Sequence, residues 1–444
     1  MIYQNIEELI GNTPLLKLRE SSHGLKNIDV YAKLEYMNPF GSVKDRTVLG
    51  LTKDIDFDKL RSRNAKLIES SSGNTAKTMQ IIARRNGTSM ISVTNRVKVP
   101  EVDNLLRYLG AEIISLPGRS ECPDPTDDDN AIARIEKMIS ADAQALVHTD
   151  QYSNQANSGI HQTTTAHEIF DDLSRIDYII ASVGTGGTSG GILKHITTNK
   201  LPTKTIGVAA HPSDFIPGIR TMNELFETAL FDKNAFTSIE EVTSSDALTA
   251  LDILVQNEGI LAGPTTGATF AALTHYLKDF DTLHEDGSRK SVVFIACDRL
   301  EPYMSYVTKR LPERFGLNAK DDIFNTYVTS QEKNIYEKSA NTATYEWTTR
   351  SNVQVIDIRG VKPFSMFHLE KSLSYPEEIL REVLEQATPF DSSKPVLFVC
   401  PKGDRSLLIA AVLRKRGTEA YSLAGGLMAW RSAGLPMTRG GDNG

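Results

Sequence analysis

The sequence predicts an α/β protein with open parallel sheets, followed by a second, smaller α/β domain. Short apolar runs rich in β-branched residues alternate with segments of helical periodicity as far as about residue 310. Such alternation is typical of parallel sheets joined by right-handed crossovers. A polar, weakly patterned stretch follows, and the alternation then restarts at about residue 353.

The strands of the first part are predicted from apolar runs, and the helices between them end in or near glycine, which enters the left-handed conformation without steric cost. The predicted strands are "DVYAKLE", "SMISVT", "AEIISL", "YIIASV", "TIGVAA" and "SVVFIA". The predicted helices are "TAKTMQIIARRNG", "VPEVDNLLRYLG", "DALTALDILVQNEG" and "GATFAALTHYL".

The later part repeats the pattern in a shorter length of chain. Its predicted elements are "VQVIDIRG", "PEEILREVLEQA", "PVLFVC", "RSLLIAAVLRKRG", "AYSLAGG" and "LMAWRSAG". About 90 residues are enough for an independent small domain. The predicted division is therefore a first domain over 1–317, a linker over 318–345 and a second domain over 346–440.

Composition narrows the class of protein. A net charge of −7 argues against nucleic acid or an anionic membrane as the main partner. The sequence has no apolar stretch long enough for a membrane span and no signal-peptide pattern. Its three cysteines, Cys122, Cys297 and Cys400, are scattered, which favours a reducing cytoplasm and excludes a disulfide scaffold or a cysteine-rich zinc site. No metal is predicted.

Three segments of the first part carry candidate chemistry. "NPFGSVKDR" places Lys44 one turn into a predicted helix, where most lysines are merely solvated. "SVGTGGTSGG" runs from a strand into a helix and presents backbone N–H groups and hydroxyls, as phosphate-binding turns do. "ESSSGNTAK" offers hydroxyls and amides to a carboxylate at a helix start. A plain turn and an over-supplied helix cap are the alternatives for the two loops.

An amine, a phosphate cradle and a carboxylate cradle together suggest pyridoxal phosphate bound to a lysine. Residues 1 to about 310 resemble the cysteine synthase and cystathionine β-synthase family, which has the type II fold of pyridoxal-phosphate enzymes with two lobes of open parallel sheet. The resemblance depends on "IGNTPLLKL", "KLEYMNPFGSVKDR", "ESSSGNT", "QYSNQAN", "SVGTGGTSGG" and "EGILAGPTTGA", in the family's order.

The resemblance implies a role for each matching residue. Lys44 would bind the cofactor covalently and move the Cα proton, and Asn74 would contact the ring hydroxyl oxygen. The cofactor phosphate would be bound by Gly184, Thr185, Gly186, Gly187 and Thr188. The substrate would be held by Ser71, Ser72, Gly73, Thr75 and Gln151.

Two further positions bear on the reaction. Thr265 would face the pyridine nitrogen, where a neutral hydroxyl does not force protonation and so favours β-elimination over transamination; a helix cap is its alternative. Arg220, in "GIRTMNELFETALFD", resembles the phosphate clamp of synthases that prefer O-phosphoserine. A surface arginine is the alternative, so O-acetylserine remains open.

The segment "VLFVCPKGDRS" places Cys400 at the end of a predicted buried strand and before a helix. Loop N–H groups, a helix start and the nearby Lys402 and Arg405 should favour the thiolate. Pro, Gly and charged residues follow at once and argue against burial, although a small buried hydrophobe is the commonest fate of a free cysteine.

Residues 350 to 438 resemble the rhodanese family, whose active loop has the pattern C-x-x-G-x-R. Cys400, Gly403 and Arg405 match this pattern, and "VIDIRG" and "LAGGLMAWRSAGLP" match flanking segments. The resemblance implies a persulfide on Cys400, stabilised by loop amides. "FHLEKS" lacks both glycines of the family's G-H-I-x-G-A segment, although His368 remains.

Together the two resemblances predict a cysteine synthase that uses pyridoxal phosphate. It would convert O-phosphoserine or O-acetylserine to L-cysteine by β-replacement through aminoacrylate, with sulfur carried on the second domain. The donor would be sulfide, thiosulfate, or a persulfide or thiocarboxylate carrier. An amine nucleophile giving a diaminopropionate derivative, homocysteine giving cystathionine, and a non-enzymatic sulfur-carrier module are the alternatives. A cytoplasmic homodimer is expected.

Overall fold

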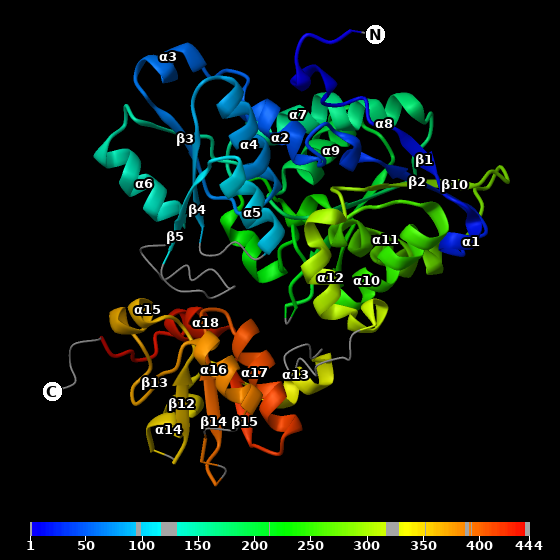
Figure 1. Ribbon diagram of the computed structural model, residues 1–444. Coiled ribbons are helices and arrows are strands. Elements are labelled where there is room, and N and C mark those ends of the chain that lie inside the picture. The colour runs from blue at the N-terminus through cyan, green and yellow to red at the C-terminus, as the bar shows by residue number, and fades with distance from the viewer. Residues whose placement is uncertain are drawn as a thin grey trace. The chain divides into compact units, whose positions relative to one another are not determined.

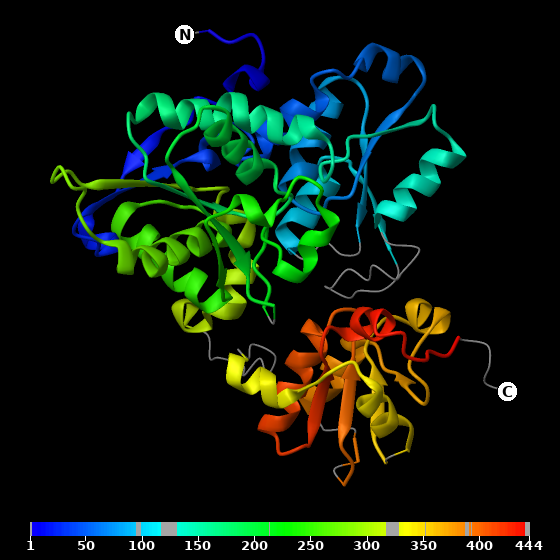
Figure 2. The same ribbon diagram turned by 180° about the vertical axis from the view of Figure 1, so that it is seen from behind.

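The computed structural model describes residues 2–94, 99–116, 131–212, 214–316, 328–350, 352–386, 390–391 and 393–439. Its contacts divide the chain into two compact units. Of the described residues, those within 1–93, 97–114 and 135–315 form the first unit, and those within 316–444 form most of the second. Among the described helices, none has the length and apolar character needed to cross a membrane. Figures 1 and 2 show the elements of each unit from opposite sides.

A six-stranded sheet forms the larger part of the first unit, and it is parallel apart from one edge strand. Its order is β1 (Leu15–Lys17), β2 (Ile28–Lys33), β10 (Lys290–Ile295), β7 (Tyr178–Ser182), β8 (Lys204–Ala210) and β9 (Ser238–Val242). Only β1 pairs antiparallel, with β2. The sheet therefore has the crossover arrangement that the sequence predicts.

Alternate residues of the central strands face opposite sides of this sheet. Tyr178 and Ile180 join one apolar cluster, with residues of α10 (Ser244–Ile253) and α11 (Pro264–Leu277). Ile179 joins another, with residues of α8 (Ala166–Asp172) and α9 (Gly187–Thr198). The helices thus cover both faces (Figures 1 and 2). A strand buried on both faces is apolar at nearly every position, which explains the continuous runs in the sequence.

The second sheet of the first unit has four strands in the order β5 (Glu112–Ser115), β4 (Met90–Thr94), β3 (Lys66–Glu69) and β6 (Leu146–His148). Its core includes residues of α2 (Lys44–Thr52), α3 (Phe57–Ser62), α4 (Asn74–Arg85), α5 (Pro100–Tyr108) and α12 (Met304–Arg310). The remaining helices are α1 (Glu20–His23), α6 (Ala131–Ala141) and α7 (Gln155–Ile160), which continues into the π-helical segment η3 (His161–Thr165). A second π-helical segment, η6 (Leu254–Glu258), extends α10.

The second unit is built on a parallel five-stranded sheet. Its order is β11 (Glu337–Lys338), β15 (Ala420–Leu423), β14 (Val396–Val399), β12 (Gln354–Asp357) and β13 (Leu373–Ser374). The helices are α13 (Ser330–Tyr336), α14 (Thr342–Arg350), α15 (Val361–Met366), α16 (Glu377–Gln386), α17 (Asp404–Lys415) and α18 (Gly426–Ser432). Two apolar clusters, one with Leu408 and one with Trp430, cover its two faces.

The structure corrects two sequence-based expectations. Part of the predicted linker 318–345 is ordered structure of the second unit, since α13 lies there and β11 pairs with β15. A two-residue strand gives no detectable alternation, so the pattern could not reveal it. Lys44 is the first residue of α2, rather than lying one turn into that helix. Cys122 lies outside the described residues.

Candidate active site

Lys44 begins α2 and lies beside the end of β10. The backbone N–H of Val43 donates to the carbonyl of Cys297 at 2.8 Å, and Ser42 forms a bridge with Asp298. Burial lowers the pKa of the Lys44 amine, and the neighbouring Cys297 and Asp298 oppose this shift. A lowered pKa raises the fraction of neutral amine, which is the form that reacts with an aldehyde.

The loop Gly184–Thr188 joins β7 to α9 and crosses closely over other backbone segments. A Cβ on Gly184 would lie 2.7 Å from the carbonyl oxygen of Gly218. Gly186 has a φ of +78° and precedes the first residue of α9. Only glycine fits such a close approach and such a φ without strain. The result is a cradle at the start of a 12-residue helix, where N–H groups and the helix dipole favour an anion.

The turn after β3 brings two predicted substrate residues into contact. Thr75 Oγ1 donates to Gln151 Oε1 at 2.9 Å, and Gln151 Nε2 donates to the carbonyl of Ser70 at 2.7 Å. Ser71 Oγ accepts from the N–H of Ala76 at 3.2 Å and so satisfies one backbone N–H in the first turn of α4. A Cβ on Gly73 would meet open space. Ser72 is partly buried in the same turn.

Asn74, the first residue of α4, belongs to a polar network that the sequence did not reveal. Its Nδ2 donates to Asp298 Oδ2 at 2.8 Å and contacts the Tyr303 hydroxyl at 3.2 Å, while its Oδ1 accepts from Lys77 Nζ at 2.8 Å. The Tyr303 hydroxyl also donates to Asp298 Oδ2. The one available signal was an acidic residue directly after an apolar strand, in "FIACDRLEPY".

The carboxylate of Asp298 is 4% exposed. Burial raises its pKa to about 6, and hydrogen bonds from Tyr303 and Asn74 limit the rise. Within the described ranges, its Oδ1 has no hydrogen-bond partner. Burial also lowers the pKa of Lys77 and raises that of Cys297 to about 12.

Thr265 and Arg220 are engaged with the protein itself. Thr265 is the second residue of α11, and its hydroxyl donates to the carbonyl of Pro217 at 2.5 Å. Arg220 Nη1 donates to the carbonyl of Glu224 at 3.2 Å, and its guanidinium lies 4.9 Å from the ring centroid of Tyr152. Neither contact assigns the role that the resemblance implies.

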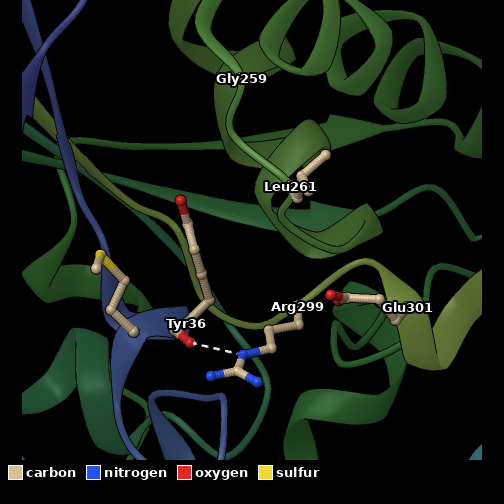
Figure 3. Close-up of a pocket in the computed structure, with 6 residues that line it drawn as sticks. Tyr36, Gly259, Leu261, Arg299 and Glu301 are labelled. Carbon is tan, nitrogen blue, oxygen red and sulfur yellow. Dashed lines mark hydrogen bonds between the residues drawn. The ribbon is translucent and has the colours of Figure 1, made fainter.

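A surface pocket of about 310 Å³ in the first unit contains none of the predicted site residues. It is lined by Tyr36, Met37, Gly259, Leu261, Arg299 and Glu301. Figure 3 shows Arg299 extending to the backbone carbonyl of Tyr36, to which its Nε donates at 3.3 Å. One residue of the pocket, Arg299, directly follows Asp298 of the polar network in the sequence.

Cys400, in the second unit, directly follows β14, and residues of the loop and helix that come after it contact its sulfur. Sγ accepts from the N–H of Gly403 at 3.1 Å and from the hydroxyl of Ser406 at 3.3 Å. Gly403 has a φ of +93°, and a Cβ there would lie 2.8 Å from the carbonyl oxygen of Leu423. These contacts explain why a glycine stands three residues after the cysteine.

The expectation of an exposed, thiolate-favouring Cys400 is wrong. The residue is 1% exposed, and burial raises the pKa of its thiol despite the hydrogen bond from Ser406. Lys402 and Arg405 are buried as well, and Arg405 Nε lies 3.6 Å from Glu377 Oε1. Sequence alone could not predict this carboxylate, which comes from α16.

Three other rhodanese-matching residues, Asp357, Arg359 and His368, are also buried. Asp357 and Arg359 form an ion pair at 2.9 Å within the segment "VIDIRG". His368 Nδ1 lies 2.9 Å from the carbonyl of Phe364, and its backbone pairs with Thr438. These contacts give Asp357, Arg359 and His368 a structural role in the second unit.

Comparison with known proteins agrees with the two-part organisation. A family model described as pyridoxal-phosphate dependent enzyme matches residues 6–298, and one described as rhodanese-like domain matches residues 341–433. Cysteine synthase A of Salmonella typhi is 29% identical over 320 residues, spanning 68% of this chain and 94% of the relative. Cystathionine β-synthase of Apis mellifera is 30% identical over 321 residues, spanning 68% of this chain and 61% of the relative.

Solved structures give the same result for the first unit. A hydrogen sulfide-producing enzyme from Fusobacterium nucleatum superposes with a TM-score of 0.60 at 27% identity. The match covers 68% of this chain and 100% of that one.

Proposed function

Because the chain belongs to the pyridoxal-phosphate-dependent enzyme family, with cysteine synthases and a cystathionine β-synthase among its relatives and a rhodanese-like domain in its later part, we propose that it makes L-cysteine from an activated serine. The first domain, over 1–317, replaces the β-substituent. The second domain, over 346–440 together with α13 and β11, carries sulfur as a persulfide on Cys400. The observation that carries the proposal is Lys44, whose pKa is lowered, in a unit that also contains a glycine cradle at the start of α9.

The described residues fit pyridoxal 5′-phosphate. The backbone at Gly184, Gly186 and Gly187 approaches other groups too closely for a side chain, and the α9 N–H groups suit a phosphate. When bound, this cofactor withdraws electrons from the substrate Cα and so eases loss of the β-substituent. Lys44 Nζ would hold the cofactor, and the same amine would accept the Cα proton of the substrate.

The other residues of the first site bind and orient. Ser71, Ser72, Gly73, Thr75 and Gln151 hold the substrate carboxylate at the start of α4, where the helix dipole favours an anion. Asn74 would contact the cofactor ring oxygen, with its amide orientation set by Lys77 and Asp298. Thr265 would face the pyridine nitrogen. Its hydroxyl hydrogen is donated to the carbonyl of Pro217, so pairing with a neutral ring nitrogen would require the hydroxyl to turn and donate to that nitrogen instead.

The activated serine is either O-phosphoserine or O-acetylserine, and Arg220 decides between them. A guanidinium binds a phosphate ester through two parallel hydrogen bonds but has no comparable contact with an acetyl group. Arg220→Ala should therefore raise KM for O-phosphoserine at least tenfold and leave KM for O-acetylserine unchanged. Steady-state kinetics with both substrates measure this, and equal effects on both would remove Arg220 from the proposal.

In the second site, Cys400 Sγ attacks the outer sulfur of the donor as a thiolate. A new S–S bond forms while the donor's own bond to that sulfur breaks, and the donor leaves with the electron pair. Two molecules of a small thiol then react in turn. The first takes the outer sulfur as its own persulfide and returns Cys400 to the thiol, and the second attacks that small persulfide, forms the disulfide of the two thiols and releases sulfide for the first site. The N–H of Gly403 and the hydroxyl of Ser406 offset part of the cost of ionising a buried thiol.

The test is product analysis on the cofactor-loaded protein, with each activated serine offered sulfide, thiosulfate plus a thiol, or an amine. We expect L-cysteine from sulfide at equal rates in the wild type and in Cys400→Ser. With thiosulfate, only the wild type should form it. An equal loss of cysteine formation by Cys400→Ser with both donors would contradict a delivery role for Cys400. A diaminopropionate product would show that the nucleophile is an amine and not a sulfur compound.

The proposal includes a homodimer in the cytoplasm. The homodimer follows from the family resemblance, and the cytoplasmic location follows from the sparse, scattered cysteines. Light scattering of the purified protein measures the oligomeric state.

A further inference from the structure

Two side chains outside the predicted site lie against the loop Gly184–Thr188. Asn157 belongs to α7, and His161 begins η3 four residues later; both are fully buried. We propose that Asn157 and His161 are positioning residues that direct the hydroxyl hydrogens of Thr185 and Thr188 toward the cofactor phosphate. This inference rests on the assignment of that loop to the phosphate in the proposed function.

The contacts of the Thr185 hydroxyl leave it only the role of hydrogen-bond donor toward a further group. A threonine hydroxyl has two acceptor lone pairs and one hydrogen. Thr185 Oγ1 accepts from Asn157 Nδ2 at 3.1 Å and from the N–H of Gly187 at 3.3 Å. With both lone pairs occupied, its hydrogen needs an outside acceptor, and a phosphate oxygen at the start of α9 provides one.

The orientation of the Asn157 amide is set by a second contact. Its Nδ2 also donates to the carbonyl oxygen of Gln151 at 2.7 Å, and a carbonyl accepts but never donates. A flipped amide would face that carbonyl with its own oxygen. Asn157 therefore joins a predicted substrate residue to the predicted phosphate loop.

The oxygen of the same amide lies against the loop backbone. Asn157 Oδ1 is buried without a hydrogen-bond partner in the described part of the chain. It lies 2.1 Å from the position that a Cβ on Gly187 would occupy. The amide thus fills the space left by the glycine, so the loop and α7 fit together only with this pair of residues.

His161 acts in the same way on Thr188. Its Nε2 lies 3.3 Å from Thr188 Oγ1 and 3.1 Å from Thr47 Oγ1, and its Nδ1 lies 2.9 Å from Thr165 Oγ1. Burial, with Lys44 and Arg46 nearby, holds the pKa of the imidazole well below its usual value, so the ring is neutral. A neutral ring carries one hydrogen, on one nitrogen.

The inference requires the tautomer with its hydrogen on Nε2. The neighbouring Thr164 donates its hydroxyl to a backbone carbonyl, whereas the buried Thr165 hydroxyl lies at His161 Nδ1. With Thr165 donating to Nδ1, the ring hydrogen is on Nε2 and is shared between Thr47 and Thr188, so Thr188 keeps its own hydrogen for the phosphate.

The segment that carries Asn157 and His161 packs closely against two helices. A Cβ on Gly191, in α9, would lie 2.4 Å from the carbonyl oxygen of Ser158. A Cβ on Gly50, in α2, would lie 2.8 Å from the carbonyl oxygen of Ala156. The segment that carries Asn157 and His161 is thus in backbone contact both with the helix that begins at Lys44 and with the helix behind the phosphate loop.

The experiment measures cofactor binding directly. Apoprotein is titrated with pyridoxal 5′-phosphate to obtain Kd, and the bound phosphate is observed by phosphorus NMR. Asn157→Ala and His161→Ala should each weaken binding by about tenfold and move the phosphate resonance, since each removes a constraint on a hydroxyl that donates to a charged group. His161→Gln, which returns an amide N–H near the Nε2 position, should recover most of the affinity.

Asn154→Ala is the matched control for loss of stability. Asn154 caps α7 through the N–H of Ala156 and, among the residues that the structure describes, makes no hydrogen bond to the loop. Its replacement should lower the thermal midpoint of the apoprotein while leaving Kd and the phosphorus spectrum unchanged. A Kd that weakens equally in Asn154→Ala would show a general effect of α7 stability and overturn the inference.

A double-mutant cycle separates this inference from the proposed site. If Asn157 acts through the Thr185 hydroxyl, Asn157→Ala should add little to the loss already caused by Thr185→Val. Full, additive losses would overturn the inference. A wild type that binds no cofactor, or a Thr185→Val variant with wild-type Kd, would instead contradict the proposed site.

Discussion

At the scale of single residues, burial opposes the ionisation of the groups on which the chemistry depends. It lowers the pKa of the Lys44 amine, raises that of the Cys400 thiol and raises that of Asp298 to about 6. For Lys44 the shift helps, because a neutral amine is the reactive form. For Cys400 it opposes the thiolate, so the hydrogen bonds at the sulfur have to compensate.

Asp298 predicts a specific dependence of stability on pH. Its pKa is higher in the folded protein, at about 6, than the ordinary 3.8, so the folded state binds its proton more tightly. The wild type therefore loses stability as pH rises from about 4 to about 6. Asp298→Asn removes this loss and should gain up to about 3 kcal/mol relative to wild type across that window.

Urea denaturation of the apoprotein at several pH values measures the effect. The exposed Asp54→Asn is the control and should parallel the wild type at each pH. A difference between Asp298→Asn and wild type that stays constant from pH 4 to pH 7 would contradict the raised pKa.

Ser406 predicts the reactivity of Cys400. Its hydroxyl donates to Sγ at 3.3 Å and favours the thiolate, so Ser406→Ala should raise the pKa of the thiol and slow its alkylation about tenfold near neutral pH. Mass spectrometry of the peptide that contains Cys400 follows the rate. Ser432→Ala, at the exposed end of α18, should leave it unchanged. A faster reaction in Ser406→Ala would assign the hydroxyl a shielding role instead.

The sequence was sufficient for residues within recognisable loops and insufficient for those that complete a site from a distance. Cys400 and Gly403 follow from one segment. Glu377, which lies beside Arg405, comes from another helix. The contacts of Asn74 with Asp298 and Tyr303 span more than 220 positions, and no local pattern encodes them.

At the scale of elements, the central strands of the six-stranded sheet were predictable, and its two edge strands were not. β7 and β10 are covered on both faces and contain the continuous apolar runs "YIIA" and "VVFI", whereas β9 reads "SIEEV" and β1 has only three residues. Helix starts at the two loops depend on backbone that only glycine adopts, at Gly186 before α9 and at Gly403 before α17. The sequence shows these glycines, but it does not show which groups of the fold lie close to each of them.

Gly187 provides the test at this scale. A Cβ there would lie 2.1 Å from Asn157 Oδ1, so Gly187→Ala should destabilise the apoprotein by about 1–3 kcal/mol and weaken cofactor binding. Gly159→Ala, in α7, meets open space and should stabilise by up to about 1 kcal/mol. Thermal denaturation and cofactor titration measure both. Equal stability of the two variants would mean that the loop does not press on Asn157.

At the scale of the whole molecule, the chain joins a pyridoxal-phosphate-dependent unit to a rhodanese-like one. The restart of the strand–helix alternation indicated this organisation without any structure. The edge of the second unit was harder to locate, because β11 has two residues and joins its sheet from within the predicted linker. Proximity of two linked modules would raise the local sulfide concentration at the first site.

The most direct test of the account is the location of the cofactor on the chain. The protein is loaded with pyridoxal 5′-phosphate, reduced with borohydride, digested and analysed by mass spectrometry. We expect the phosphopyridoxyl group on Lys44 and its absence in Lys44→Ala. A label on Lys77 or another lysine, or no label at all, would contradict the account.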